Sequence, residues 1–88
     1  AVSIYRKAFS KPHPRLARST HNLGKIRLKE NSFEEAELLF LDALHQRLEL
    51  SGEQDANTQT TLRFLTELYS AWNRPDKAAE YEKMVSSQ

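Results

Sequence analysis

The sequence contains no cysteine, only two glycines and only three prolines among its 88 residues. Without cysteine, disulfide bonds and thiolate metal sites are excluded, and a reducing compartment is permitted. The three histidines, at positions 13, 21 and 45, lack the spacing of a metal site. The sequence therefore predicts a protein that needs no cofactor and no metal, and we expect it in the cytoplasm.

Long hydrophobic runs are also missing. No apolar stretch approaches the ~20 residues that a membrane span requires, and no signal-peptide pattern opens the chain. A chain of this length forms one domain at most, and its core must be thin because it buries only about 60% of its unfolded surface. The first residues, AVSIYRKAF, resemble the second half of a helix. We therefore expect a single domain without membrane contact that is part of a longer chain.

Acidic residues are absent before Glu30, whereas eight of the 13 lysines and arginines lie in residues 1–29. This first part carries a net charge of +8. All 12 acids and the other five basic residues follow it, which gives the remainder a net charge of −7. The chain is therefore an electrical dipole along its sequence.

The few glycines and prolines leave long segments in which apolar residues recur at helical spacing and strand-type alternation is missing. The prolines fall where helices would begin or end. Four such segments stand out: LARSTHNLGKIRLKE, FEEAELLFLDALHQRLEL, TLRFLTELYSAW and PDKAAEYEKMV. With the truncated segment at the start, the sequence predicts an all-α fold of about five antiparallel helices.

An internal repeat divides the chain. KENSFEEAE, at 29–37, aligns with AWNRPDKAA, at 71–79, at an offset of 42. This offset pairs similar residues, among them Leu23 with Leu65, Asn31 with Asn73 and Ala36 with Ala78. A second offset, of 35, places Ala1, Tyr5 and Ala8 over Ala36, Phe40 and Ala43. The predicted units are the second helix of a truncated repeat (1–11), a full repeat (13–51) and a terminal capping repeat (55–87).

These residues resemble a known family. Leu23-Gly24, followed by Ala36-x3-Phe40 and Ala43, is similar to the helix-turn-helix pattern of the tetratricopeptide repeat (TPR). The 42-residue spacing, headed by HPRLARSTHNLG, resembles the kinesin light chain type. LTELYSAWNRPDKAAEYEKMV resembles the final repeat of some bacterial multi-repeat proteins, including kinases with such tails. The resemblance covers nearly the whole chain and implies an α-α superhelix (solenoid), here the C-terminal portion of a longer array.

The segment 33–50 is apolar over roughly 200° of a helical projection, whereas a one-sided helix shows about 100°. Its apolar residues are Ala36, Leu39, Phe40, Leu41, Ala43, Leu44, Leu48 and Leu50. One neighbouring helix cannot cover this surface, so we expect partners on two sides. Small residues such as Gly24 would let paired helices approach while Phe40 fills the gap. The last helix has Glu82 where the 42-residue offset requires Phe40, which is typical of an end cap.

No catalytic pattern is present, because the chain lacks a nucleophile elbow, a glycine-rich phosphate loop and paired carboxylates. We therefore predict that it is not an enzyme. The resemblance implies a concave groove lined by the first helix of each repeat. Four residues of this helix, three of them basic, recur there at three- and four-residue steps: Arg18, Asn22, Lys25 and Lys29. They share a face and could hold an acidic peptide or a terminal carboxylate by charge-assisted hydrogen bonds. The candidate groove residues are Arg18, His21, Asn22, Lys25, Lys29, Arg63 and Phe64.

Five of these residues carry specific expectations or alternatives. The resemblance implies that Asn22 contacts a peptide backbone. Phe64 lies off the predicted packing stripe and is a candidate apolar anchor, although packing on a loop or on upstream repeats is equally open. His21 is interpreted as a neutral groove or surface residue. Lys25 and Lys29 have plain solvation as their alternative.

Two functions remain. The first is a protein-protein interaction scaffold that binds an acidic or extended peptide in the basic groove. The alternative is a structural C-terminal cap of a longer array, which mediates self-association or docks an attached enzyme domain. Nucleic acid is disfavoured as a partner because the basic residues lack interleaved aromatic residues and a base-reading motif.

Overall fold

The computed structural model describes residues 13–85, which form four helices. These are α2 (Pro14–Lys29), α3 (Phe33–Ser51), α4 (Ala56–Ala71) and α5 (Pro75–Met84). No strand occurs within 13–85, so the all-α prediction is confirmed for this part of the chain. The helix expected at 1–11 lies outside the described residues.

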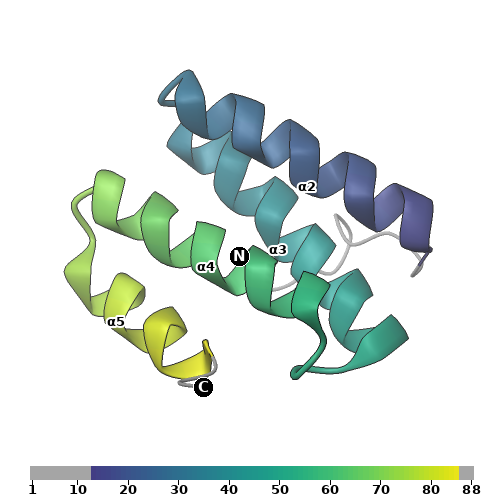
Figure 1. Ribbon diagram of the computed structural model, residues 1–88. Helices are drawn as coiled ribbons and strands as arrows, with labels where there is room; N and C mark the ends of the chain where they lie inside the picture. Colours follow the sequence, from purple (N-terminus) through teal and green to yellow (C-terminus); the bar gives the residue numbers. More distant parts are fainter. Residues whose placement is uncertain (1–12, 86–88) are drawn as a thin grey trace, which may run out of the picture.

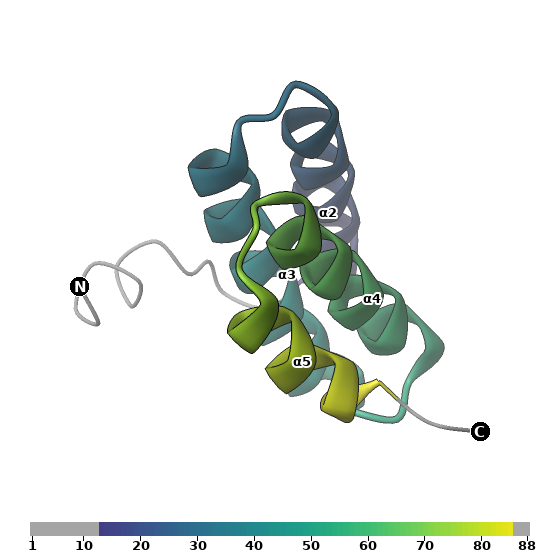
Figure 2. The ribbon, with the colours of Figure 1, turned by 90° about the vertical axis from the view of Figure 1, so that its left-hand side faces the viewer.

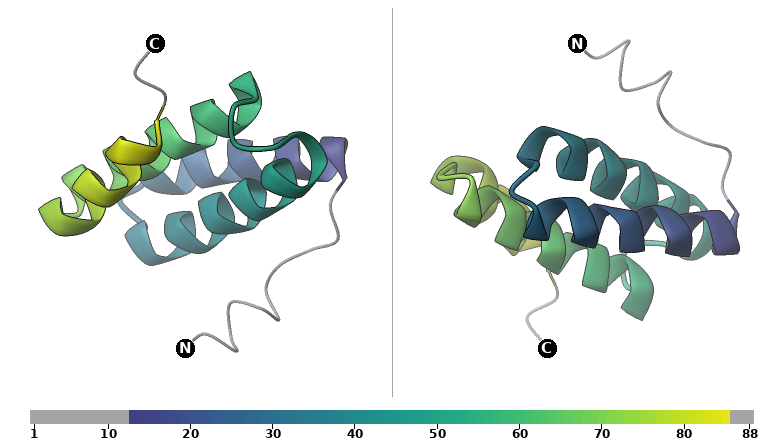
Figure 3. Two further views of the ribbon diagram at one scale, coloured as in Figure 1. Left: turned by 90° about the horizontal axis from the view of Figure 1, so that it is seen from below. Right: turned by 90° about the horizontal axis from the view of Figure 1, so that it is seen from above.

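The helices pack as two hairpins, α2 with α3 and α4 with α5, and α3 also packs against α4 (Figure 1). Viewed from the side, α2 and α5 lie at opposite ends of this arrangement (Figure 2). From above, α2 runs along α3 (Figure 3). The helix α3 therefore has helical partners on two sides, as the width of its apolar face predicts.

Local signals in the sequence place the helix starts. At the start of α2, His13 accepts a hydrogen bond at Nδ1 from the Arg15 backbone N–H (3.2 Å), and Pro14 occupies the first turn. At the start of α4, Asp55 accepts one from the Asn57 N–H (2.9 Å). The predicted start of α5 at Pro75 is confirmed. Proline suits this position because the N–H it lacks would have no partner inside the helix.

The ends of α2 and α4 have the same geometry. Asn31 and Asn73, which the repeat offset pairs, follow these helices with φ of 62° and 60°. Asparagine tolerates this left-handed conformation better than most residues. In both turns, backbone N–H groups return to carbonyls of the last helical turn: Ser32 to Arg27 (2.9 Å) and Asn31 to Leu28 (3.0 Å), then Arg74 to Tyr69 (2.8 Å) and Asn73 to Ser70 (3.2 Å). These are Schellman motifs, and the bounds of α4 coincide with those of α2 at the 42-residue offset.

The core lies between α3, α4 and α5. Its buried members are Ala36, Phe40, Leu44, Leu62, Leu65, Leu68, Tyr69 and Ala78. On the α2 side, Gly24 faces the Phe40 ring so closely that a Cβ at this position would lie 3.0 Å from Cε1. The absence of a side chain at Gly24 therefore lets α2 lie directly on a fully buried ring.

Replacing Gly24 with leucine is expected to lower the free energy of unfolding by roughly 1–3 kcal/mol, because the new side chain overpacks the contact with Phe40. Urea unfolding followed by circular dichroism measures this loss. Asn22→Leu is the matched control, since Asn22 is an exposed residue of the same helix and surface substitutions usually change stability by less than about 0.5 kcal/mol. Equal losses in the two variants would contradict the close contact.

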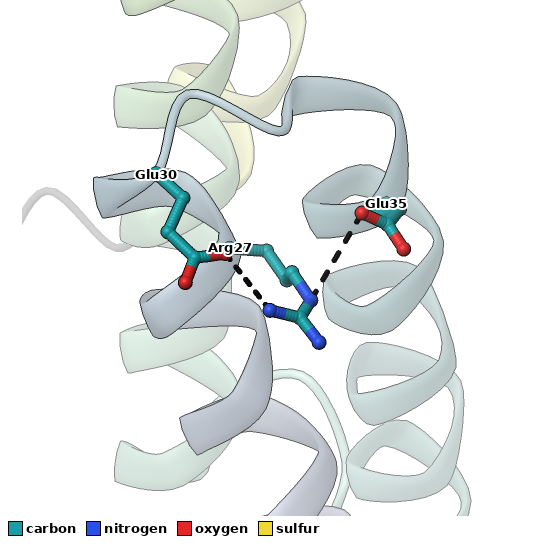
Figure 4. A network of polar contacts seen from close by, with 3 residues as sticks. All are labelled: Arg27, Glu30 and Glu35. Carbon is teal, nitrogen blue, oxygen red and sulfur yellow. Dashed lines mark hydrogen bonds and ion pairs between the residues drawn. The ribbon is translucent and has the colours of Figure 1, made fainter.

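A polar network joins the end of α2 to the start of α3 (Figure 4). Arg27 Nη1 lies 2.8 Å from Glu30 Oε1, and its Nε lies 4.0 Å from Glu35 Oε1. The repeat places Tyr69 of α4 at the position that corresponds to Arg27 of α2. The Tyr69 hydroxyl also contacts an acid of α3, because it donates a hydrogen bond to Glu37 Oε2 (2.7 Å). Exposed ion pairs contribute little stability. We therefore expect the ion pairs of Arg27 to orient the turn between α2 and α3 more than they stabilise the fold.

Not every apolar residue is covered. Leu38 and Leu50 of α3 are exposed, and so are Leu16, Leu23 and Ile26 of α2. Leu23 thus differs from Leu65, its counterpart at the 42-residue offset, which is fully buried. Among the described helices, none is long and apolar enough to cross a membrane.

Candidate functional site

A groove of about 630 Å³ lies between α2, the C-terminal end of α3 and the first turns of α4. Its lining combines cationic, amide and apolar side chains. The lining residues are Pro14, Arg15, Ala17, Arg18, His21, Asn22, Lys25, Arg47, Leu50, Ser51, Asn57, Thr60 and Phe64.

The groove contains five of the seven residues that the sequence singles out: Arg18, His21, Asn22, Lys25 and Phe64. The other two, Lys29 and Arg63, are exposed and do not line it. Lys29 is the last residue of α2, one turn beyond Lys25. Arg63 precedes Phe64 by one residue, which turns its side chain by about 100° around the α4 axis.

Two further cations line the groove that the sequence pattern does not single out. Arg15 lies in the first turn of α2, and Arg47 comes from α3, which the sequence pattern presents as packing scaffold. Arg47 is the only lysine or arginine of α3. An isolated cation near the end of an otherwise acidic and apolar helix is the signal that could have identified it.

The charge of the groove has one sign. Arg15, Arg18, Lys25 and Arg47 line it, and none of its lining residues is acidic. Cations gathered in a concave surface concentrate their field and attract anions. The groove is therefore suited to carboxylates.

Arg47 is held in place by α4. Its Nη1 donates to the Asn57 backbone carbonyl (3.0 Å) and to Thr61 Oγ1 (2.7 Å). Burial lowers the pKa of Arg47, and the charge of Asp55 acts in the opposite direction. A guanidinium remains protonated in proteins and has five N–H donors, so the N–H groups not used by α4 form a preorganised cationic donor at the groove.

His21 forms a buried wall of the groove, with only 4% of its surface exposed. Its Nδ1 lies 3.3 Å from Thr61 Oγ1, the oxygen that also accepts from Arg47. Burial, then the positive charges of Arg47 and Lys25, lower the pKa of His21 to about 4. The imidazole is therefore neutral at neutral pH, and the cations around the groove are arginine and lysine.

Phe64 connects the groove to the core. Its ring stacks on Phe40 with centroids 5.7 Å apart and meets His21 edge-on at 5.1 Å. Lys25 Nζ lies 5.5 Å from the centre of the same ring. Phe64 is half-buried, and Leu50 beside the groove is 42% exposed. The groove thus combines an apolar wall with a basic rim.

The described residues include no cluster of three or more histidine or acidic side chains that could hold a metal ion. Comparisons with protein-family models, curated proteins and solved structures found no match. The groove itself is therefore the basis for proposing a function.

Proposed function

We propose that this chain is a non-catalytic protein-interaction module with a TPR-like superhelical fold, whose groove binds an acidic or extended peptide segment. One observation carries the proposal: four cations and no acid line a groove that also has an apolar wall. Peptide carboxylates accept charge-assisted hydrogen bonds from arginine, often in bidentate geometry. An adjacent apolar side chain of the peptide would pack against Phe64.

The residues have complementary roles in this proposal. Arg47 is the fixed donor, since α4 already orients its guanidinium and little entropy is lost when a carboxylate binds. Arg18 and Lys25 are exposed on α2 and supply adaptable charge. Asn22 lies between them along the helix, and its amide can donate to and accept from an extended peptide backbone.

Replacing Lys25 or Arg18 with glutamine is expected to weaken binding of a peptide rich in aspartate and glutamate by about tenfold. A hydrogen bond to a charged group contributes about 1.5 kcal/mol or more, and ~1.4 kcal/mol corresponds to a factor of ten in Kd. Fluorescence anisotropy with a labelled peptide of this composition, containing one leucine, measures the change at about 0.15 M salt.

The matched controls are Lys29→Gln and Arg63→Gln, which remove the same charges outside the groove. We expect them to change Kd by less than about twofold, because neither side chain lines the groove and both are exposed, so that salt and water screen their charges. Equal losses in the groove and control variants would indicate general charge attraction and contradict the proposed site. Absence of binding to the parent chain would also contradict it.

The second candidate function is a structural C-terminal cap of a longer array, which mediates self-association or docks an attached enzyme domain. It is favoured by α5, which buries only Ala78 and exposes Glu80, Glu82 and Lys83. Solenoids end in units with such a polar outer face. Self-association would join the basic part of one copy to the acidic part of the next, head to tail, and such an association can continue indefinitely. It predicts oligomers at low salt that dissociate at high salt. Sedimentation equilibrium tests this, and a monomer at both salt concentrations would contradict it.

A further inference from the structure

The arginines of the groove gather at one of its ends. Arg15 and Arg18 lie in the first two turns of α2. Arg47 reaches the same end from α3, because α2 begins where α3 ends (Figure 1). There the His13 backbone N–H donates to Oε1 of Gln46, the residue before Arg47 (3.3 Å). We name Arg15, Arg18 and Arg47 the arginine end of the groove.

Lys25 and Phe64 form the other end. Lys25 follows Arg18 by seven residues, which is about 10 Å along α2, and its Nζ lies 5.5 Å from the centre of the Phe64 ring. The groove thus has guanidinium groups at one end and an ammonium group beside an aromatic ring at the other. The two ends can therefore hold different side chains of one extended ligand.

Arg47 keeps donors for such a ligand. Both of its hydrogen bonds to α4 start from Nη1. The edge formed by Nε and Nη2 presents two parallel N–H groups, the arrangement in which a guanidinium binds two oxygens of one anion. Asp55 caps α4 by accepting the Asn57 backbone N–H (2.9 Å) and does not line the groove. No carboxylate of the groove lining therefore competes with an anionic ligand.

The arginine end has more charge than one carboxylate neutralises. Its three guanidinium groups are positive, whereas an aspartate or glutamate of a peptide supplies one negative charge and two oxygens. A phosphorylated serine or threonine supplies a charge of about −1.5 to −2 near neutral pH and three acceptor oxygens. Arginine clusters are a recurring means of recognising phosphorylated peptides. The chemistry of this end therefore fits a phosphate group better than a single carboxylate.

We propose that the arginine end binds the phosphate of a phosphorylated serine or threonine in the peptide, and that an apolar side chain about three residues away packs against Phe64. This spacing follows from the ~10 Å between the two ends and the ~3.3 Å that each residue of an extended peptide spans. The proposal rests on the proposed peptide-binding function and names the group that the groove prefers.

Fluorescence anisotropy with the 88-residue chain and three labelled peptides tests the proposal. The peptides share one acidic sequence with a leucine three residues from a central position, which is phosphoserine, aspartate or serine. We expect the phosphoserine peptide to bind at least about tenfold more tightly than the aspartate peptide, the factor that one further charge-assisted hydrogen bond contributes.

Arg18→Lys tests the role of the guanidinium, because lysine keeps the charge and lacks the planar fork. It should reduce the preference for phosphoserine over aspartate by at least about threefold. The matched control is Arg63→Lys, which makes the same exchange at an exposed position of α4 outside the groove. The preference should be unchanged in this control. Arg18 is exposed as well, so both variants are expected to fold, and circular dichroism checks this.

Three results would overturn the phosphate site. The first is equal affinity for the phosphoserine and aspartate peptides, and the second is an equal effect of Arg18→Lys and Arg63→Lys. The third is displacement of the phosphoserine peptide by vesicles of phosphatidylcholine with a phosphoinositide at lower phosphate concentration than the unlabelled peptide requires, which would assign the arginines to a lipid headgroup. If the aspartate peptide binds as tightly as the phosphoserine peptide and Lys25→Gln weakens both, the peptide groove stands without a phosphate preference. Binding of none of the three peptides would contradict the groove itself.

Discussion

Replacing Phe40 with alanine is expected to lower the free energy of unfolding by about 3–5 kcal/mol. Phe40 is fully buried in the core of α3 and α4. Its ring also faces Gly24 of α2, meets His21 edge-on at 5.3 Å and stacks on Phe64 at 5.7 Å. One side chain therefore joins three helices, and its removal leaves a cavity where they meet. Urea unfolding monitored by the fluorescence of Trp72 and by circular dichroism measures the loss.

The matched control is Phe33→Ala. Phe33 lies at the start of α3, is half-buried and stacks on Trp72 with centroids 5.8 Å apart. Because the hydrophobic contribution follows the apolar area removed from water, the same truncation should cost clearly less here. Natural domains are stable by only about 5–15 kcal/mol, so Phe40→Ala removes a large part of the total. A loss no greater than that of Phe33→Ala would contradict the central place of Phe40.

Lowering the pH from 6.5 to 4 is expected to destabilise the fold through His21, by up to roughly 3 kcal/mol. Burial and the charges of Arg47 and Lys25 lower the folded pKa from 6.5 to about 4, and one pKa unit corresponds to about 1.4 kcal/mol. In this pH window the unfolded chain binds a proton at His21 that the folded chain does not, so stability rises with pH. The contribution is complete above pH 6.5 and is lost as the pH falls towards 4.

Carboxylates also titrate near the lower end of this window, so the measurement compares the parent chain with His21→Gln. Glutamine keeps a polar partner for Thr61 and does not titrate. Urea unfolding of both proteins at pH 7.5, 5.5 and 4.5 gives the difference in their free energies of unfolding, which should shift in favour of His21→Gln as the pH falls. A difference that does not change with pH would show that His21 carries no such penalty.

The fold could be predicted where the determining signals are local. Pro75 marks the start of α5, and apolar residues at helical spacing outline all four described helices. The relation between Gly24 and Phe40 was also accessible, because a glycine in the middle of a helix beside a large aromatic at the paired position implies close approach. These features depend on neighbours in sequence or on the pairing of successive helices.

The groove could be predicted only in part, because its remaining members depend on contacts distant in sequence. Arg18 and Lys25 were accessible from their spacing on one helix. The orientation of Arg47 depends on the backbone of Asn57 and the hydroxyl of Thr61 in the next helix. The burial of His21 requires rings from both α3 and α4. Helical spacing alone does not contain this information.

The stacked rings of Phe40 and Phe64 have a consequence for redesign of the proposed binding groove. Phe64 belongs to the groove on one side and rests on the core on the other. Exchanging Phe64 to alter ligand preference would therefore also change folding stability, whereas Arg15, Arg18 and Lys25 are exposed and can be exchanged singly. The charges on the exposed basic rim can be altered one at a time, whereas Phe64 must be redesigned together with the core residues on which it stacks.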